Sequence, residues 1–127
     1  MPTLPWTRIA QPAAEAEVVV MASHFKLSSL LRVPRFLYDA MRIRAQATGA
    51  DGAFGVSLVA RPLAREFYTL SAWRDRDAIT SFVRAEPHRS TMTRHRAGMA
   101  DSKFVFYDVA GDALPPSWDE ARTRLRS

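Results

Sequence analysis

The chain has 127 residues, of which 47% are hydrophobic and 24% are charged, a composition typical of one soluble globular domain. It excludes a disordered tail, a collagen-like repeat and a polytopic membrane protein. The absence of cysteine excludes disulfides, thiolate metal sites and thiol catalysis. The net charge of +5 comes mainly from arginines. These are spread along the chain without a nucleic-acid-binding motif, so we expect a solvated basic surface and no nucleic-acid partner.

Residues 1–16 contain three of the eight prolines, and we expect them to form an extended lead-in. The chain does not start with a basic segment followed by a long apolar run, so we expect no secretory signal. The longest apolar stretch, residues 18–22, is too short to cross a bilayer. These features favour a cytoplasmic protein without membrane contact.

Residues 17–25 predict the first strand, because they form a short apolar run rich in β-branched side chains. A helix is expected from Val33 to Gly49, since Pro34 suits the first helical turn. Its apolar stripe, at spacing i, i+4, i+7 and i+11, consists of Phe36, Ala40, Ile43 and Ala47. The charged residues expected mostly on its opposite side are Arg35, Asp39, Arg42 and Arg44.

Two further strands are expected over residues 54–60 and 66–73, and the short link between them predicts a hairpin. The next helix should begin near Asp75 or Asp77, because either carboxylate can cap its first turn. It should end before Pro87, since a residue preceding proline disfavours helical geometry.

Another helical pattern spans about residues 88–97, and residues 104–109 predict the last strand. A final short helix is expected over residues 118–125 with Ser117 as its cap. The order β-α-β-β-α-(α)-β-α is, apart from the extra helix, the split βαβ arrangement.

We therefore expect an α+β, ferredoxin-like fold, in which helices cover one face of a four-stranded antiparallel sheet. A single domain spans residues 1–127, with 112–127 as a C-terminal helical extension. The strands are apolar on both faces, as Val18 and Val20 alternate with Val19 and Met21. Because an uncovered apolar face usually marks an interface, we expect a homodimer in which two sheets pack face to face.

Three segments carry a resemblance to a known group of proteins. Residues 33–37, 65–73 and 82–89 read VPRFL, REFYTLSAW and FVRAEPHR. They resemble the dimeric α+β barrel superfamily, which includes antibiotic biosynthesis monooxygenases and haem-degrading monooxygenases, and more closely its DUF3291-like bacterial members. The likeness covers about residues 17–110. It implies a dimeric α+β barrel and a monooxygenase-like reaction.

The resemblance also implies site residues. The haem-degrading branch places an Asn on the first strand and a Trp and a His on the helix after the third strand. This chain contains no Asn; Phe82 stands at the Trp position, and His88 and His95 are the nearest histidines.

The cofactor-free, quinone-forming members of the superfamily use a pocket Trp, Tyr, Asn and Arg. The residues of this chain that match those types are Trp73, Tyr68 or Tyr107, and Arg65. This correspondence implies a pocket that acts on an aromatic substrate.

The most specific chemical pattern follows Pro87. At i, i+4, i+7 and i+11, one face of a helix carries His88, Met92, His95 and Met99. Imidazole and thioether groups are soft donors that suit haem iron, but the same pattern also fits an ordinary half-buried helix face. His24, at the end of the first strand, can carry a proton or simply cap the strand.

Along residues 66–73, alternation places Phe67, Thr69, Ser71 and Trp73 on one face. This mixture of aromatic and hydroxyl side chains is typical of a ligand-lining wall, whereas Tyr68, Leu70 and Ala72 suit a helix-facing core. Arg65, in the hairpin link, is a candidate to hold an acidic substrate group.

We therefore predict a monooxygenase-like enzyme that acts, without a cofactor or metal, on an aromatic or polycyclic substrate in a cavity between helices and sheet. Alternatives are a haem-binding protein that uses His88 or His95 and a non-enzymatic dimeric ligand-binding module. The predicted catalytic residues are His88, His24 and Trp73. The predicted substrate-binding residues are Phe67, Thr69, Ser71, Arg65, Phe82 and Met92.

Overall fold

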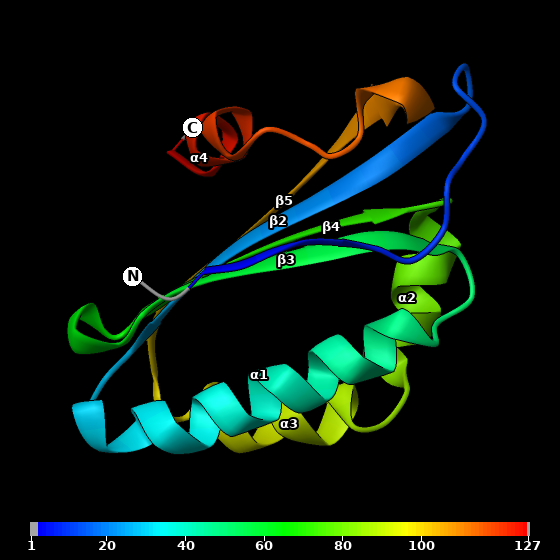
Figure 1. Ribbon diagram of the computed structural model, residues 1–127. Helices are drawn as coiled ribbons and strands as arrows, with labels where there is room; N and C mark the ends of the chain where they lie inside the picture. Colours follow the sequence, from blue (N-terminus) through cyan, green and yellow to red (C-terminus); the bar gives the residue numbers. More distant parts are fainter. Residues whose placement is uncertain (1–2, 127) are drawn as a thin grey trace.

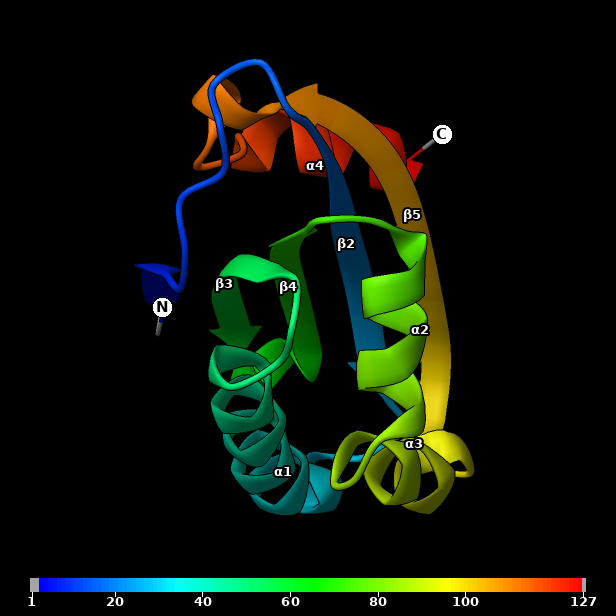
Figure 2. The same ribbon diagram turned by 90° about the vertical axis from the view of Figure 1, so that its right-hand side faces the viewer.

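One antiparallel sheet with helices on both faces organises the chain, and the structure, a computed structural model, describes residues 3–126. The strands are β1 (Thr3–Arg8), β2 (Glu17–Leu27), β3 (Ala53–Arg61), β4 (Glu66–Trp73) and β5 (Met99–Ala110). The helices are α1 (Val33–Thr48), α2 (Arg76–Arg84), α3 (His88–Arg96) and α4 (Trp118–Arg126). Short 3₁₀ turns occur at Leu30–Arg32, Pro62–Ala64 and Gly111–Ala113. Helices α1, α2 and α3 lie on one face of the sheet, which we call the inner face, and α4 lies on the outer face (Figures 1 and 2).

The sheet has five strands in the order β1-β3-β4-β2-β5, so the expectation of four strands was wrong. The fifth strand is β1, which lies in the predicted lead-in and pairs with the edge of β3. Its proline, Pro5, lacks a backbone donor, but an edge strand tolerates proline. The indole ring of Trp6 lies directly over Gly55, where a Cβ atom would collide with it. Glycine at this position therefore allows β1 to dock.

The predicted α+β, ferredoxin-like order of helices and strands is otherwise confirmed. Asp75 caps α2 by accepting a hydrogen bond from the Ala78 amide at 2.8 Å, and Ser117 caps α4. Strand β5 begins at Met99 and so is longer than predicted. Its polar first half carries no strand signal of its own, but it pairs with the far end of β2.

The inner face of the sheet and the helices α1 and α2 enclose two apolar clusters. The first brings Trp73 of β4 against Ile79 and Phe82 of α2. The second brings Phe67 of β4 against Phe36 of α1, with ring centroids 4.6 Å apart. Between these clusters the inner face is lined by smaller and more polar side chains, and this is where a cavity opens.

The outer face is partly covered by the chain's own C-terminal helix. Ala121 and Leu125 of α4 are buried against Val18 and Val20 of β2 and against Tyr107 of β5. The expectation that helices cover only one face was therefore wrong, because the predicted C-terminal helix folds back across β2 and β5 (Figure 2). Within residues 3–126, no helix is long and apolar enough to span a membrane.

Candidate active site

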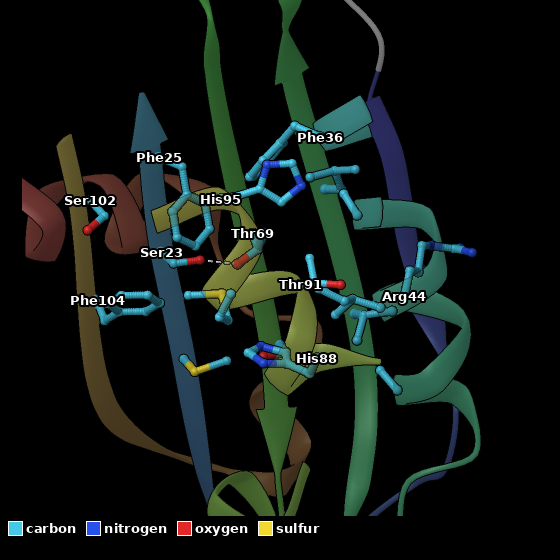
Figure 3. Close-up of a pocket in the computed structure, with 18 of the residues that line it drawn as sticks. Ser23, Phe25, Phe36, Arg44, Thr69, His88, Thr91, His95, Ser102 and Phe104 are labelled. Atoms are coloured by element: carbon cyan, nitrogen blue, oxygen red, sulfur yellow. Dashed lines mark hydrogen bonds between the residues drawn. The ribbon is translucent and has the colours of Figure 1, made fainter. Parts of the chain in front are cut away.

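A cavity of about 610 Å³ lies between the inner face of the sheet and the helices α1 and α3 (Figure 3). Its volume is in the range of about 300–1,000 Å³ that small-molecule sites occupy. The apolar part of the wall consists mainly of Met21, Phe25, Phe36, Trp73, Phe82 and Phe104. The polar part includes Ser23, Thr69, Ser71, His88, Thr91 and His95. An apolar chamber with a few placed polar groups suits an aromatic ligand that carries oxygen atoms.

The predicted helix face of histidine and methionine side chains after Pro87 lines this cavity. Helix α3 presents His88, Met92 and His95 to it, and Thr91 lies on the same side. The helix ends at Arg96, so Met99 belongs to β5, but its side chain also lines the cavity.

His88 is held in the wall by α1. The side chain of Gln46 accepts a hydrogen bond from the His88 amide at 3.0 Å and donates one to the carbonyl of Phe82 at 3.0 Å. Gln46 thus ties α1 to the end of α2 and the start of α3. The His88 ring packs edge-on against Phe82 at a centroid distance of 5.1 Å.

Three polar atoms of cavity-lining residues lack a partner. Among the described residues, Nδ1 of His88, Oγ1 of Thr91 and Nε of Arg44 are buried and have no hydrogen-bond partner. Buried polar atoms are almost always hydrogen-bonded, so each exception needs an explanation. Burial also lowers the pKa of His88 below its ordinary value of 6.5, which favours the neutral imidazole. A ligand with hydroxyl or carbonyl oxygens would supply the missing partners.

At the other end of the cavity, His95 is paired with a buried carboxylate. Oδ2 of Asp39 lies 2.7 Å from Nε2 of His95, and the Asp39 side chain is fully buried. The same oxygen accepts hydrogen bonds from Nε of Arg35 at 3.1 Å and from Nη1 of Arg94 at 2.9 Å. A third guanidinium, that of Arg42, lies 3.8 Å from Oδ1.

These contacts determine whether the Asp39 carboxyl group is ionised. Burial by itself would raise the pKa of Asp39, but hydrogen bonds from the imidazole and two guanidinium groups outweigh burial and hold the pKa below its ordinary value of 3.8. The carboxylate is therefore ionised and can only accept hydrogen bonds. It follows that Nε2 of His95 carries the proton, and that Nδ1 of a neutral His95 has a free lone pair.

Most of the residues predicted from the sequence meet in the cavity. Those that line it are His88, Trp73, Thr69, Ser71, Phe82 and Met92, together with His95 from the haem alternative. Nε1 of Trp73 donates to Oγ of Ser71 at 2.8 Å, and Thr69 is hydrogen-bonded to Ser23 of β2. Their roles in binding or catalysis stay predictions.

Three predicted site residues do not line the cavity. His24 lies on the outer face, where its ring stacks on Tyr68 at 4.5 Å and Nε2 lies 3.7 Å from Glu66. Phe67 is fully buried in the cluster with Phe36. Arg65 ends the hairpin turn with φ of 61° and bonds back to Pro62. Tyr68 and Tyr107 also belong to the outer-face cluster.

Sequence reasoning missed Asp39 and Gln46. Asp39 was assigned to the charged side of its helix, but it follows Phe36 by three residues and precedes Ile43 by four, so it shares their face. An acidic residue at stripe spacing, flanked by Arg35 and Arg42, was a usable signal. Gln46 gave none, because its partners are backbone groups on two other helices.

The contacts of the two cavity histidines differ from those that usually support a haem-ligating histidine. Haem iron is bound through Nε2 of histidine, whose other nitrogen donates to a carboxylate or carbonyl. In His95 it is Nε2 that pairs with the carboxylate, and Nδ1 of His88 has no such partner among the described residues. Within residues 3–126, no group of three or more His, Cys, Asp or Glu side chains could hold a metal ion.

No family model and no curated protein matches the chain, but solved structures share its fold. One of them is SnoaB, a cofactor-independent oxygenase from Streptomyces nogalater, which is 19% identical to this chain in sequence and superimposes with a TM-score of 0.61. The match covers 77% of this chain and 97% of the SnoaB chain. A protein from Nitrosomonas europaea, assigned as an antibiotic biosynthesis monooxygenase, is 14% identical with a TM-score of 0.66, over 79% and 93% of the two chains.

A dimeric ferredoxin-like protein of unknown function from Thermobifida fusca is 12% identical with a TM-score of 0.62, over 78% of this chain and 98% of its own. At such low identity these similarities establish the fold. The chain therefore has the α+β, ferredoxin-like fold of the antibiotic biosynthesis monooxygenases.

Proposed function

We propose that this protein is a cofactor-independent monooxygenase that oxidises an aromatic or polycyclic substrate in the cavity between the helices and the sheet. The observation that carries the proposal is the cavity itself, which combines aromatic walls with two histidines and three buried polar atoms that lack partners among the described residues. The fold shared with a cofactor-independent oxygenase supports the same reaction class.

The reaction needs a substrate that supplies its own electrons. A base removes a proton from a methylene next to aromatic rings, and the resulting carbanion transfers one electron to O₂. Superoxide and the carbon radical combine into a peroxide. Loss of the second methylene proton and cleavage of the O–O bond then leave a carbonyl group and release water. In sum, R₂CH₂ and O₂ give R₂C=O and H₂O, and the protein contributes a base and a site shielded from water.

Anthrone, a tricyclic compound with such a methylene, tests the proposal. We expect the protein to accelerate its oxidation to anthraquinone in air without any added cofactor, as measured by absorbance. Ala40→Phe, which places a ring in the cavity from α1, should abolish the acceleration. Ala45→Phe, the same change at an exposed position of the same helix, is the control and should retain it.

Two results would argue against an oxygenase. If anthrone binds in the wild-type cavity but is not oxidised faster than in buffer, the protein is a ligand-binding module. If Ala40→Phe oxidises anthrone as fast as Ala45→Phe does, the reaction takes place outside this cavity.

We further propose that the protein is a homodimer joined through the part of the outer face that α4 leaves uncovered. The dimeric neighbour from Thermobifida fusca supports this assembly, as do the partly exposed apolar side chains of Phe54 and Tyr68 beside the outer-face cluster. Size-exclusion chromatography with light scattering at micromolar protein should give twice the chain mass of 14.3 kDa. A monomer under these conditions would contradict the proposal.

A further inference from the structure

We infer that His95 is the general base of this cavity and that Asp39 is the residue that positions it and stabilises its protonated form. This inference rests on the proposed function, since it identifies the group that removes the first substrate proton. It assigns roles to a pair of residues that lie 56 positions apart in the sequence.

The geometry gives His95 what a base requires. Its ring is buried in the cavity wall, edge-on to Phe36 at a centroid distance of 5.1 Å. The carboxylate of Asp39, fully buried and 2.7 Å from Nε2, fixes the tautomer in which Nδ1 is the acceptor. A proton taken up at Nδ1 turns the pair into an imidazolium beside a carboxylate, so the new charge is compensated where it forms.

The other charged groups around Asp39 leave this compensation in place. Arg35 and Arg42 reach it from α1, and Arg94 reaches it from α3. Their side chains are 53%, 43% and 41% exposed, so their charges interact with water as well as with the carboxylate. The contact between His95 and Asp39 is buried, and at 2.7 Å it is shorter than the contact of any of the three guanidinium groups with Asp39.

His88, the other cavity histidine, has a different environment. Among the described residues it forms no ion pair with a carboxylate, and its buried Nδ1 has no hydrogen-bond partner. A proton on this ring would remain uncompensated in an apolar wall. His88 is thus suited to accept or donate a hydrogen bond to a bound substrate, while His95 is suited to take up the proton.

A phenol that changes colour on ionisation tests proton transfer separately from the reaction with O₂. We choose 4-nitrophenol, whose anion has a long-wavelength absorbance band that the neutral form lacks, at a pH below its solution pKa. Wild-type protein should bind the phenol and produce the anion band, because the proton moves from the phenol oxygen to Nδ1 of His95. In His95→Gln the phenol should bind in its neutral form, since glutamine can still donate to Asp39 but cannot take up a proton.

His24→Gln is the matched control, because the His24 ring lies on the outer face of the sheet, away from the cavity, and this variant should still produce the anion band. If His95→Gln keeps the band, His95 is not the base. If 4-nitrophenol does not bind to the wild-type protein, or binds equally to Ala40→Phe, the cavity is not a phenol site, and the proposed function fails together with the base.

With anthrone as substrate, His95→Gln should lower kcat about 100-fold or more with little change in KM, since general-base catalysis contributes about 10²–10⁴-fold. His95→Ala opens space for free imidazole, and added imidazole should restore part of kcat. Such rescue does not follow from a merely structural role. Unchanged kcat in His95→Gln, or no response of His95→Ala to imidazole, would overturn the assignment even if the wild-type protein is an oxygenase.

Discussion

Replacing Asp39 with alanine is expected to lower the free energy of unfolding by about 3 kcal/mol, which corresponds to a fall in Tm of about 10 °C for a chain of this size. The carboxylate is fully buried and accepts three hydrogen bonds, one from His95 and two from arginines. Removing it leaves the buried imidazole donor without an acceptor and three guanidinium groups without their shared anion. Urea denaturation followed by circular dichroism measures the change.

The stability lost in Asp39→Ala should depend on pH. Because the pKa of Asp39 is lower in the folded protein than its ordinary value of 3.8, its contribution to stability is complete above that value. The contribution disappears as the pH falls through the folded pKa. The difference in stability between the wild type and Asp39→Ala should therefore shrink in strong acid.

Asp108→Ala is the control, because Asp108 is exposed on β5 and its loss should change stability by less than about 0.5 kcal/mol. A change in Asp39→Ala no larger than in Asp108→Ala, or a difference that does not shrink in strong acid, would contradict the ionised, buried network described here.

Phe67→Ala is expected to lower the free energy of unfolding by about 3–5 kcal/mol. Phe67 is fully buried, its ring packs on Phe36 at 4.6 Å, and truncation leaves a void that the surrounding strands cannot fill. The sequence placed Phe67 in the substrate wall, whereas its position in the core predicts that it acts on stability. Denaturation by urea, together with 4-nitrophenol titration of the remaining folded protein, separates the two roles.

Phe104→Ala is the comparison variant, and we expect it to weaken ligand binding with little loss of stability. Phe104 lines the cavity on the edge strand β5 and is 43% exposed, so its loss should cost less than about 1 kcal/mol but weaken 4-nitrophenol binding. Wild-type stability in Phe67→Ala combined with weakened binding would instead return Phe67 to the cavity wall.

Local patterns were sufficient to predict most of the fold. The apolar run of β2, the stripe from Phe36 to Ala47 and the cap at Asp75 each specify their element from neighbouring residues alone. Strand β1 was missed because Pro5 weakens its strand signal and its pairing depends on the distant edge of β3. The outer-face position of α4 likewise depends on contacts with β2 and β5.

In the candidate site, too, neighbouring residues predict some features, whereas others depend on contacts between distant segments. Helical spacing placed His88, Met92 and His95 on one face, and strand alternation placed Thr69, Ser71 and Trp73 together. Alternation cannot say where along a strand the cavity ends, so Phe67 was included. The pairing of Asp39 with His95 joins α1 to α3, and no local pattern carries information on such a contact between helices.

Oxygen-isotope labelling is the most direct test of an oxygenase reaction in this cavity. Anthrone is incubated with the protein under ¹⁸O₂, and the product is analysed by mass spectrometry, with Ala40→Phe treated in the same way to measure spontaneous oxidation. The cavity chemistry predicts that the anthraquinone formed in excess over this background carries one atom of ¹⁸O, with the other atom of O₂ released as water. Equal product with the wild type and Ala40→Phe, or excess product without ¹⁸O, would show that the cavity does not insert oxygen from O₂.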